Sequence, residues 1–211
     1  AFLTAYQNAA YAERYRRLAA EAQRIEAAKA PGKTGLAEAV ARYLFKLMAY
    51  KDEYEVARLY TDGAFAKQVA AQFDGDNLRF EFHLAPPILA PTDGKTGQPK
   101  KLSFGPWMMP AFRLLAKLKV LRGTAFDPFG RSAERRTERK LIADYEALLA
   151  DIFEKLNADN HHLAVALASL PEKIRGYGYV KARHLAAAKA EEANLLEQFR
   201  SGPTPVLKAA E

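Results

Sequence analysis

Histidine and cysteine, the residues that most often bind metals or act as nucleophiles, give little support for chemistry in this sequence. His161 and His162 are adjacent, so on a helix their side chains would diverge by about 100°, and His83 and His184 stand alone. Cysteine is absent, which excludes disulfides, thiolate metal ligands, iron–sulfur ligation and cysteine nucleophiles in these 211 residues. No G-x-S-x-G nucleophile motif occurs either. The sequence therefore predicts no metal and no autonomous catalytic centre.

Two GKTG tetrapeptides, Gly32–Gly35 and Gly94–Gly97, are similar to the end of a phosphate-binding loop. Such a loop also needs a glycine five residues before its GK pair, so that successive backbone amides can turn toward the phosphates. Those positions are Ala27 and Leu89. The segment 74–77 is similar to a calcium loop and to the GDG of a thiamine diphosphate motif, but it lacks the downstream ligands of both. A turn before a strand is the better prediction there.

Positive charge is concentrated in one part of the chain. The formal net charge is +7, and residues 95–140 contain twelve Lys and Arg against three acids. Like charges three or four residues apart on a helix repel, so we expect these bases to have partners. Solvent, carboxylates elsewhere in the fold, another domain and a phosphate group all remain open. The candidate anion-binding or docking residues are Arg122, Arg131, Arg135, Arg139, Arg175 and Lys181.

The same charge raises nucleic-acid binding as an alternative, because basic patches attract phosphates. No zinc finger is possible without cysteine, and no recognition-helix signature stands out. The aromatic residues do not alternate with the basic run as a base-stacking platform would require. A basic nucleic-acid-binding helical module is therefore an alternative that the sequence does not favour.

The elements that must position these side chains are mainly helices. Apolar residues recur at spacings of three and four over residues 2–29, from 36 to about 60, and up to about 73. The period returns from about 106 to 122, over some 25 residues from Ser132, in a shorter stretch ending at Pro171, and from about 179 to 199. Pro31, Gly32 and Gly123 mark ends of these segments.

Between the helical regions the apolar period changes to two. Leu78, Phe80, Phe82 and Leu84 alternate with polar residues, which predicts a strand with one apolar face. Residues 91–110 are rich in proline and glycine, with a second strand expected at 101–104.

The predicted fold class is mainly α, with six to eight helices and a small β-hairpin or short antiparallel sheet near residues 78–104. The single domain 1–211 is divided into helical residues 1–73, a β-arm with loops at 74–105, helical residues 106–200 and a tail at 201–211. No apolar run approaches the length of about 18 residues that a membrane span needs. A cytoplasmic protein without membrane contact is expected.

Four strings are distinctive: YKDEYEVARLYT (residues 50–61), FHLAPPILAPTDGKTGQPKKLSFGPWMMPAF (82–112), LKVLRGTAFDPFGRSAERRTERKLIADYE (118–146) and LASLPEKIRGYGYVKARHLAAA (167–188). In this order they resemble the C-terminal region of the fused bacterial indolepyruvate ferredoxin oxidoreductases, within the 2-oxoacid:ferredoxin oxidoreductase family. The resemblance covers nearly the whole chain. It implies a C-terminal accessory domain of a larger enzyme.

The resemblance also implies the chemistry of a parent enzyme. Enzymes of that family oxidatively decarboxylate aryl pyruvates to acyl-coenzyme A, using thiamine diphosphate with a divalent metal, iron–sulfur clusters, coenzyme A and ferredoxin as electron acceptor. This sequence has no cysteine for a cluster and no complete diphosphate motif. We therefore expect these residues to hold no cofactor and to be non-catalytic alone, with the chemistry elsewhere in the parent.

Two roles inside such an enzyme follow as hypotheses. The first is structural: the domain docks on other domains or subunits of the parent and supports assembly. The second is a regulatory role, in which the six basic residues named above, near turns at Gly123, Gly130, Gly176 and Gly178, hold the phosphates of coenzyme A or another anion.

Overall fold

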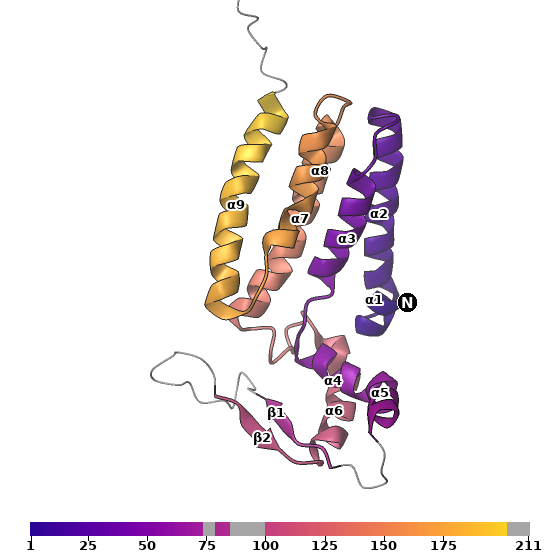
Figure 1. Ribbon diagram of the computed structural model, residues 1–211, viewed down its shortest axis with the longest axis vertical. Helices are drawn as coiled ribbons and strands as arrows, with labels where there is room; N and C mark the ends of the chain where they lie inside the picture. The colour runs from indigo at the N-terminus through magenta and orange to yellow at the C-terminus, as the bar shows by residue number, and fades with distance from the viewer. Residues whose placement is uncertain (74–78, 85–99, 202–211) are drawn as a thin grey trace, which may run out of the picture. The chain divides into compact units, whose positions relative to one another are not determined.

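The structure, a computed structural model, describes residues 1–73, 79–84 and 100–201. Within those ranges the chain forms nine α-helices, two short 3₁₀ helices and one two-stranded sheet (Figure 1). The predicted fold class, mainly α with a small antiparallel hairpin, is confirmed. Leu78, the second GKTG copy, the segment 74–77 and the tail after Ser201 lie outside the described residues.

The chain divides into two compact units, residues 1–50 with 136–211 and residues 51–135. We refer to them as the bundle and the inserted unit. The sequence-based division had grouped residues 51–73 with the helices before them. In the structure they belong instead with residues up to 135, so that the inserted unit is much larger than a hairpin arm.

The bundle consists of helices that run alongside one another along their length (Figure 1). Its elements are α1 (Phe2–Tyr6), α2 (Ala9–Lys29), α3 (Leu36–Met48), most of α7 (Ala133–Lys155), α8 (His161–Ser169), the 3₁₀ helix η2 (Leu170–Lys173) and α9 (Gly178–Ser201). One continuous apolar core joins these helices, and its most deeply buried side chains include Leu36, Leu44, Leu149, Ile152 and Leu167.

Polar caps divide two segments that the apolar period predicted as continuous helices. Residues 2–29 form α1 and α2, because the Asn8 side chain accepts a hydrogen bond from the Tyr11 amide at 2.8 Å and starts a new helix. The segment from 36 to about 60 is likewise divided, and its first helix, α3, ends at Met48. It starts again as α4 (Glu53–Thr61) after Asp52, whose side chain accepts from the Glu55 amide at 2.8 Å.

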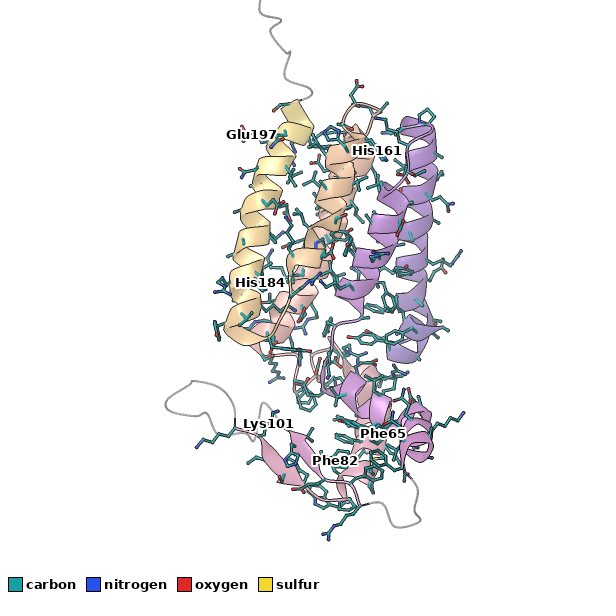
Figure 2. All side chains as sticks on the ribbon, viewed as in Figure 1. Phe65, Phe82, Lys101, His161, His184 and Glu197 are labelled. Carbon is teal, nitrogen blue, oxygen red and sulfur yellow. The ribbon has the colours of Figure 1, made fainter. Side chains whose placement is uncertain are left out.

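The start of α3 depends on a carboxylate from the preceding helix. Gly35 stands at the N-cap with a φ of +121°, which favours glycine, and it has no side chain to cap with. The Glu26 carboxylate instead accepts from the amides of Leu36 at 2.7 Å and Ala37 at 3.0 Å. It also bonds to His161 Nε2 at 2.7 Å, at the first residue of α8 (Figure 2).

The inserted unit has a smaller, aromatic core. Its elements are α4, α5 (Ala64–Gln72), β1 (Phe82–Leu84), β2 (Leu102–Phe104), α6 (Met108–Lys117) and the 3₁₀ helix η1 (Leu118–Leu121). The rings of Tyr60 and Phe112 stack with 5.2 Å between their centroids, and Phe82 meets both edge-on, with Phe65 against Tyr60. Phe65 and Phe82 are labelled in Figure 2. The strands pair antiparallel, with Phe82 opposite Phe104.

Candidate functional site

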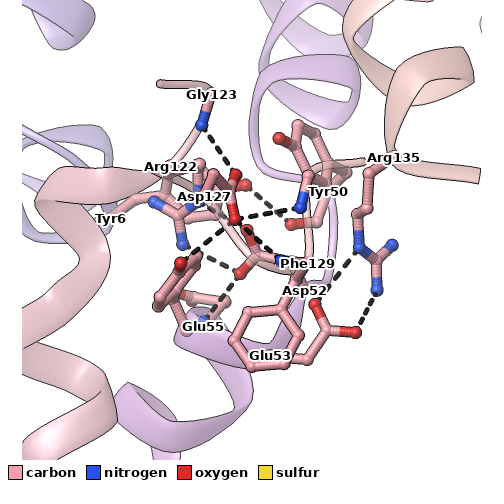
Figure 3. A network of polar contacts seen from close by, with 12 residues as sticks. Tyr6, Tyr50, Asp52, Glu53, Glu55, Arg122, Gly123, Asp127, Phe129 and Arg135 are labelled. Carbon is pink, nitrogen blue, oxygen red and sulfur yellow. Dashed lines mark hydrogen bonds and ion pairs between the residues drawn. The ribbon is translucent and has the colours of Figure 1, made fainter. Parts of the chain in front are cut away.

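A buried polar network of the inserted unit begins at Asp52 (Figure 3). While capping α4, its carboxylate also accepts two hydrogen bonds from Arg122, at 2.5 Å from Nε and 2.9 Å from Nη2. Both side chains are buried, and Arg122 is 5% exposed. The guanidinium also lies over the Tyr54 ring, 5.5 Å from its centroid. Arg122 thus connects α4 to the segment after η1 from inside the fold.

Asp127 forms the second half of this network. Its carboxylate accepts from the amides of Gly123 at 2.8 Å, Gly130 at 2.9 Å and Phe129 at 3.1 Å. The Tyr54 hydroxyl donates to it at 3.1 Å. Burial by itself favours the protonated acid, but the backbone hydrogen bonds and the Tyr54 hydroxyl outweigh burial and lower the pKa of Asp127. Asp127 therefore stays ionised and fixes the turn between 123 and 130.

The amides at this turn are consequently occupied by a carboxylate of the same unit. Arg131 is exposed and donates from Nη2 to the Ala125 carbonyl at 3.1 Å. Arg135 is mostly buried and forms two hydrogen bonds with Glu53, at 3.1 and 3.3 Å. Of the predicted basic residues in this unit, Arg122 and Arg135 are paired with acids of the fold. This outcome is one of the alternatives that the sequence had left open.

The other three predicted residues lie in the bundle. Lys181 on α9 pairs with the buried Glu138 on α7. Arg175 is exposed, and it bonds to the carbonyl of Glu172 at 2.9 Å and to its carboxylate at 3.0 Å. Arg139 is partly buried on α7. The candidate set is therefore divided between the two units.

Lys46, which sequence reasoning did not select, lies near Arg175 and Lys181. Its ammonium donates to the carbonyls of Pro171 at 2.6 Å and of Glu172 and Ile174 at 3.2 Å each, and so caps the end of η2. Burial lowers the pKa of Lys46, and the positive charges of Arg175 and Lys181 add to that effect. Lys46 stands in the middle of a predicted helix, and no local sequence signal marks a lysine whose acceptors are more than 120 residues away.

Three of the four histidines form contacts within the fold, and His162 is exposed. His161 bonds to Glu26, His83 faces Ser103 across the hairpin at 3.0 Å, and His184 Nδ1 lies 2.8 Å from the Arg175 carbonyl oxygen. Among the described residues no group of three or more His, Asp or Glu side chains is arranged to hold a metal ion. No helix in the described ranges combines the length and the apolar character that crossing a membrane requires.

The surface of the inserted unit also exposes large apolar side chains. Trp107 is 63% exposed, Leu114 62%, Val120 65% and Phe126 81%. Together with Leu118 they account for five of the ten exposed large apolar residues in the described ranges. The apolar period of the sequence predicts one face with Phe112, Leu115, Leu118 and Leu121. In the structure Phe112 is buried but Leu118 is 38% exposed, and a second apolar face was not predicted. The signal was present in the sequence, as Trp107, Pro110, Leu114 and Leu118 follow helical spacing.

Comparisons with known proteins give one match. No curated protein and no solved structure matches the chain. Residues 1–194 match a family described as "Family of unknown function (DUF6537)", and this match covers nearly all of the described bundle and the whole of the inserted unit. The chain therefore belongs to the DUF6537 family.

Proposed function

We propose that the chain is a non-catalytic docking domain within a larger enzyme of the indolepyruvate ferredoxin oxidoreductase type, where it supports assembly of the catalytic parts. The resemblance of the four sequence strings supplies the identity of the parent. The parent would oxidatively decarboxylate aryl pyruvates with thiamine diphosphate, a divalent metal, iron–sulfur clusters, coenzyme A and ferredoxin. The chain itself contributes an ordered, positively charged scaffold.

The observation on which this proposal rests is the apolar surface of residues 107–126. Contiguous exposed apolar side chains on a folded unit mark sites of association with other proteins. Five large apolar residues within twenty positions of one unit are 38–81% exposed. A docking role accounts for this surface because association would remove these side chains from water.

The internal ion pairs also support a scaffold role. Asp52 with Arg122, Glu53 with Arg135 and Glu138 with Lys181 tie elements of the fold together. Glu26 and His161 do the same at the start of α3 and α8. Within each unit these groups neutralise and orient one another, so they hold its elements in a defined arrangement.

The test compares the full-length parent with a parent lacking these residues. We expect the truncated enzyme to lose solubility or its native oligomeric state, measured by sedimentation velocity, and to lose indolepyruvate turnover with ferredoxin as acceptor. The isolated chain should show no turnover. Supplying the isolated chain in trans should restore part of the assembly. A truncated parent with unchanged oligomeric state and turnover would rule out the docking role, and turnover by the isolated chain would rule out its non-catalytic character.

The proximity of Lys46, Arg175 and Lys181 favours a second candidate, a phosphate or coenzyme A site on the bundle. Burial is the main cause of the lowered pKa of Lys46, and an anion held there would offset the repulsion from Arg175 and Lys181 that adds to it. Coenzyme A should then raise the melting temperature of the chain, and Arg175→Ala should abolish the rise. Arg24→Ala, at an exposed arginine on α2, is the matched control. The absence of any shift at millimolar coenzyme A removes this candidate.

A further inference from the structure

Helix α6 has two apolar faces, and only one of them lies in the core of the inserted unit. Phe112 is buried there against Phe82 and Tyr60, with Met108, Met109, Leu115 and Ala116 around it. A helix that only covers a core needs a single apolar stripe and is polar on the other side. Trp107 meets the Phe104 ring edge-on, with 5.8 Å between ring centroids, but Trp107 and Leu114 stay more than 60% exposed, so folding of this unit leaves most of the second apolar face uncovered.

The second face is a continuous stripe of Trp107, Pro110, Leu114 and Leu118, which we call the outer stripe. Trp107 has helical backbone angles, φ −59° and ψ −15°, so it continues the helix by one residue before Met108. The spacings of three, four and four place all four residues on one side of the helix, opposite Phe112. All four are exposed, Trp107 and Leu114 by more than 60%.

One edge of the outer stripe is positively charged. Arg113 and Lys117 are exposed, lie one turn apart and follow the stripe on the same side. Neither forms an ion pair with a described residue. No Asp or Glu occurs between Lys100 and Phe126. The surface thus combines an apolar strip with an edge of uncompensated cations.

We propose that the outer stripe is the docking surface for an amphipathic helix that bears carboxylates along one edge of its apolar face. This proposal rests on the proposed docking function and specifies its surface and its partner. Apolar side chains of such a helix would pack on Trp107 and Leu114, reading them at helical spacing as amphipathic helices do on their partners. Its carboxylates would pair with Arg113 and Lys117, which sets the orientation of the partner. An antiparallel isologous contact between two copies of the stripe is disfavoured because it would bring the two basic edges together, and no isologous contact supplies the carboxylates that Arg113 and Lys117 lack.

Trp107 gives a direct readout, because it is the one tryptophan of the chain and belongs to the outer stripe. The probe is a synthetic helical peptide of 18 residues with leucine along one face and glutamate along one edge, without Trp or Tyr. Its control is the same peptide with lysine in place of glutamate. We expect the acidic peptide to shift Trp107 emission to the blue and to reduce acrylamide quenching, with an affinity at least about tenfold higher than the basic peptide has.

Variants connect the signal to the stripe. Leu114→Asp should weaken the acidic peptide at least about tenfold, and Arg113→Glu with Lys117→Glu should reverse the preference between the two peptides. Matched controls in the same unit are Leu59→Asp, at a partly exposed apolar residue of α4, and Lys67→Glu, at an exposed lysine of α5. Both should leave the affinities unchanged. Circular dichroism confirms that each variant is folded.

Three results would overturn the proposal. The first is no response of Trp107 to the acidic peptide at millimolar concentration, and the second is an equal response to both peptides. The third is that acrylamide already fails to quench Trp107 in the chain alone, which would mean that the outer stripe is covered without a partner helix. Sedimentation velocity would then show whether a second copy or the same chain covers it. If truncation of the parent abolishes assembly while the acidic peptide fails to bind, the docking function stands and the outer stripe is the wrong surface. If the acidic peptide binds while truncation of the parent has no effect, the outer stripe binds such a helix but the docking function in the parent is wrong.

Discussion

Arg122 has the sequence context of a ligand-binding residue and the position of an internal one. It precedes a glycine turn in the most basic part of the chain, yet its guanidinium is enclosed by Asp52 and the Tyr54 ring. Burying two charged side chains costs solvation free energy, which is offset only when the two form an ion pair with good hydrogen bonds. Removing one partner leaves the other charge buried without a countercharge. The pair therefore makes a sharp thermodynamic prediction.

Arg122→Met should destabilise the chain by about 3–5 kcal/mol, because Asp52 would remain buried without a countercharge. Asp52→Asn should cost less, since asparagine can still cap α4, although it leaves Arg122 buried. The double variant should be more stable than the sum of the two single effects implies, by about 1–3 kcal/mol of coupling. Urea unfolding of all four proteins measures this cycle. Simple additivity would contradict a direct Asp52–Arg122 pair.

Asp127→Asn tests the turn. The carboxylate accepts three backbone amides, and an asparagine NH₂ group would face one or more of those donors. We expect a loss of roughly 1–3 kcal/mol in the free energy of unfolding. Glu134→Gln, which removes a negative charge from an exposed side chain, should change stability by a few tenths of a kcal/mol at most. Equal effects of the two variants would show that net charge, rather than the turn amides, matters.

At the scale of elements, Glu26 joins three helices. Burial alone would raise its pKa, but the bonds from His161 and from the Ala37 and Leu36 amides prevail, and the pKa of Glu26 is lowered below 4.5. A carboxyl whose pKa is lower in the folded state stabilises the fold above its unfolded pKa, and this stabilisation is lost as the pH falls through the folded value. Acidification below about pH 4.5 should therefore weaken the bundle.

Glu26→Gln should flatten that dependence. Between pH 6 and pH 3.5, the free energy of unfolding should fall less steeply for the variant than for the unsubstituted chain, because the variant has no carboxylate to protonate at this position. At pH 6 the variant should already be less stable, since its amide cannot accept from both backbone donors and His161 as the carboxylate does. Glu21→Gln, at a partly exposed residue of α2, is the control. Identical slopes for all three proteins would contradict this role.

Gly176 sets the entry into α9. Its φ is +91°, and a Cβ atom added there would lie 2.9 Å from Val180 Cγ1. Gly176→Ala should thus lower stability by roughly 1–2 kcal/mol, and Val180→Ala in the same background should recover the steric part of that loss. Gly32→Ala meets no atom within 4 Å at a φ of +80°, so it measures the backbone strain alone. Thermal unfolding checks all three, and equal losses at Gly32 and Gly176 would remove the steric contribution.

The sequence could predict the elements better than their contacts. The change of apolar period from three and four to two located the hairpin, and Ser132 and Pro171 located helix ends, because these signals are local. Asn8 and Asp52 also carry local capping signals, but the continuous apolar period hid them. Glu26, Lys46 and Arg122 bond to partners 10 to 135 residues away. No spacing rule specifies such pairs, so the polar site could not be assembled from sequence.

At the scale of the whole molecule, the two units have separate apolar cores of unequal size. The bundle core contains many buried aliphatic residues, whereas the aromatic core of the inserted unit has only Ala57, Phe82 and Phe112 as buried members among the described residues, with Tyr54 buried apart from them in the polar network. Less apolar area removed from water means a smaller free energy of unfolding. The inserted unit should therefore open first.

Hydrogen exchange measured by mass spectrometry tests this order. Amides of α4 and α6 should exchange faster than those of α3 and α7, and Arg122→Met should speed exchange in α4 and α6 while leaving the bundle helices unchanged. Leu149→Ala, in the bundle core, should speed amide exchange in α3 and α7 and leave α4 and α6 unchanged. A uniform response to both variants would mean that the units unfold as one.

The insertion of residues 51–135 between two segments of the bundle has a consequence for the evolution of the chain. The entropy of closing a flexible connection grows only with the logarithm of its length, so that doubling it costs about 0.6 kcal/mol. Lineages could therefore lengthen or shorten the connections between the elements of this insertion at little cost. Variation in length among relatives should concentrate in those connections, whereas α4 and α6 should keep the sequence strings that mark the family.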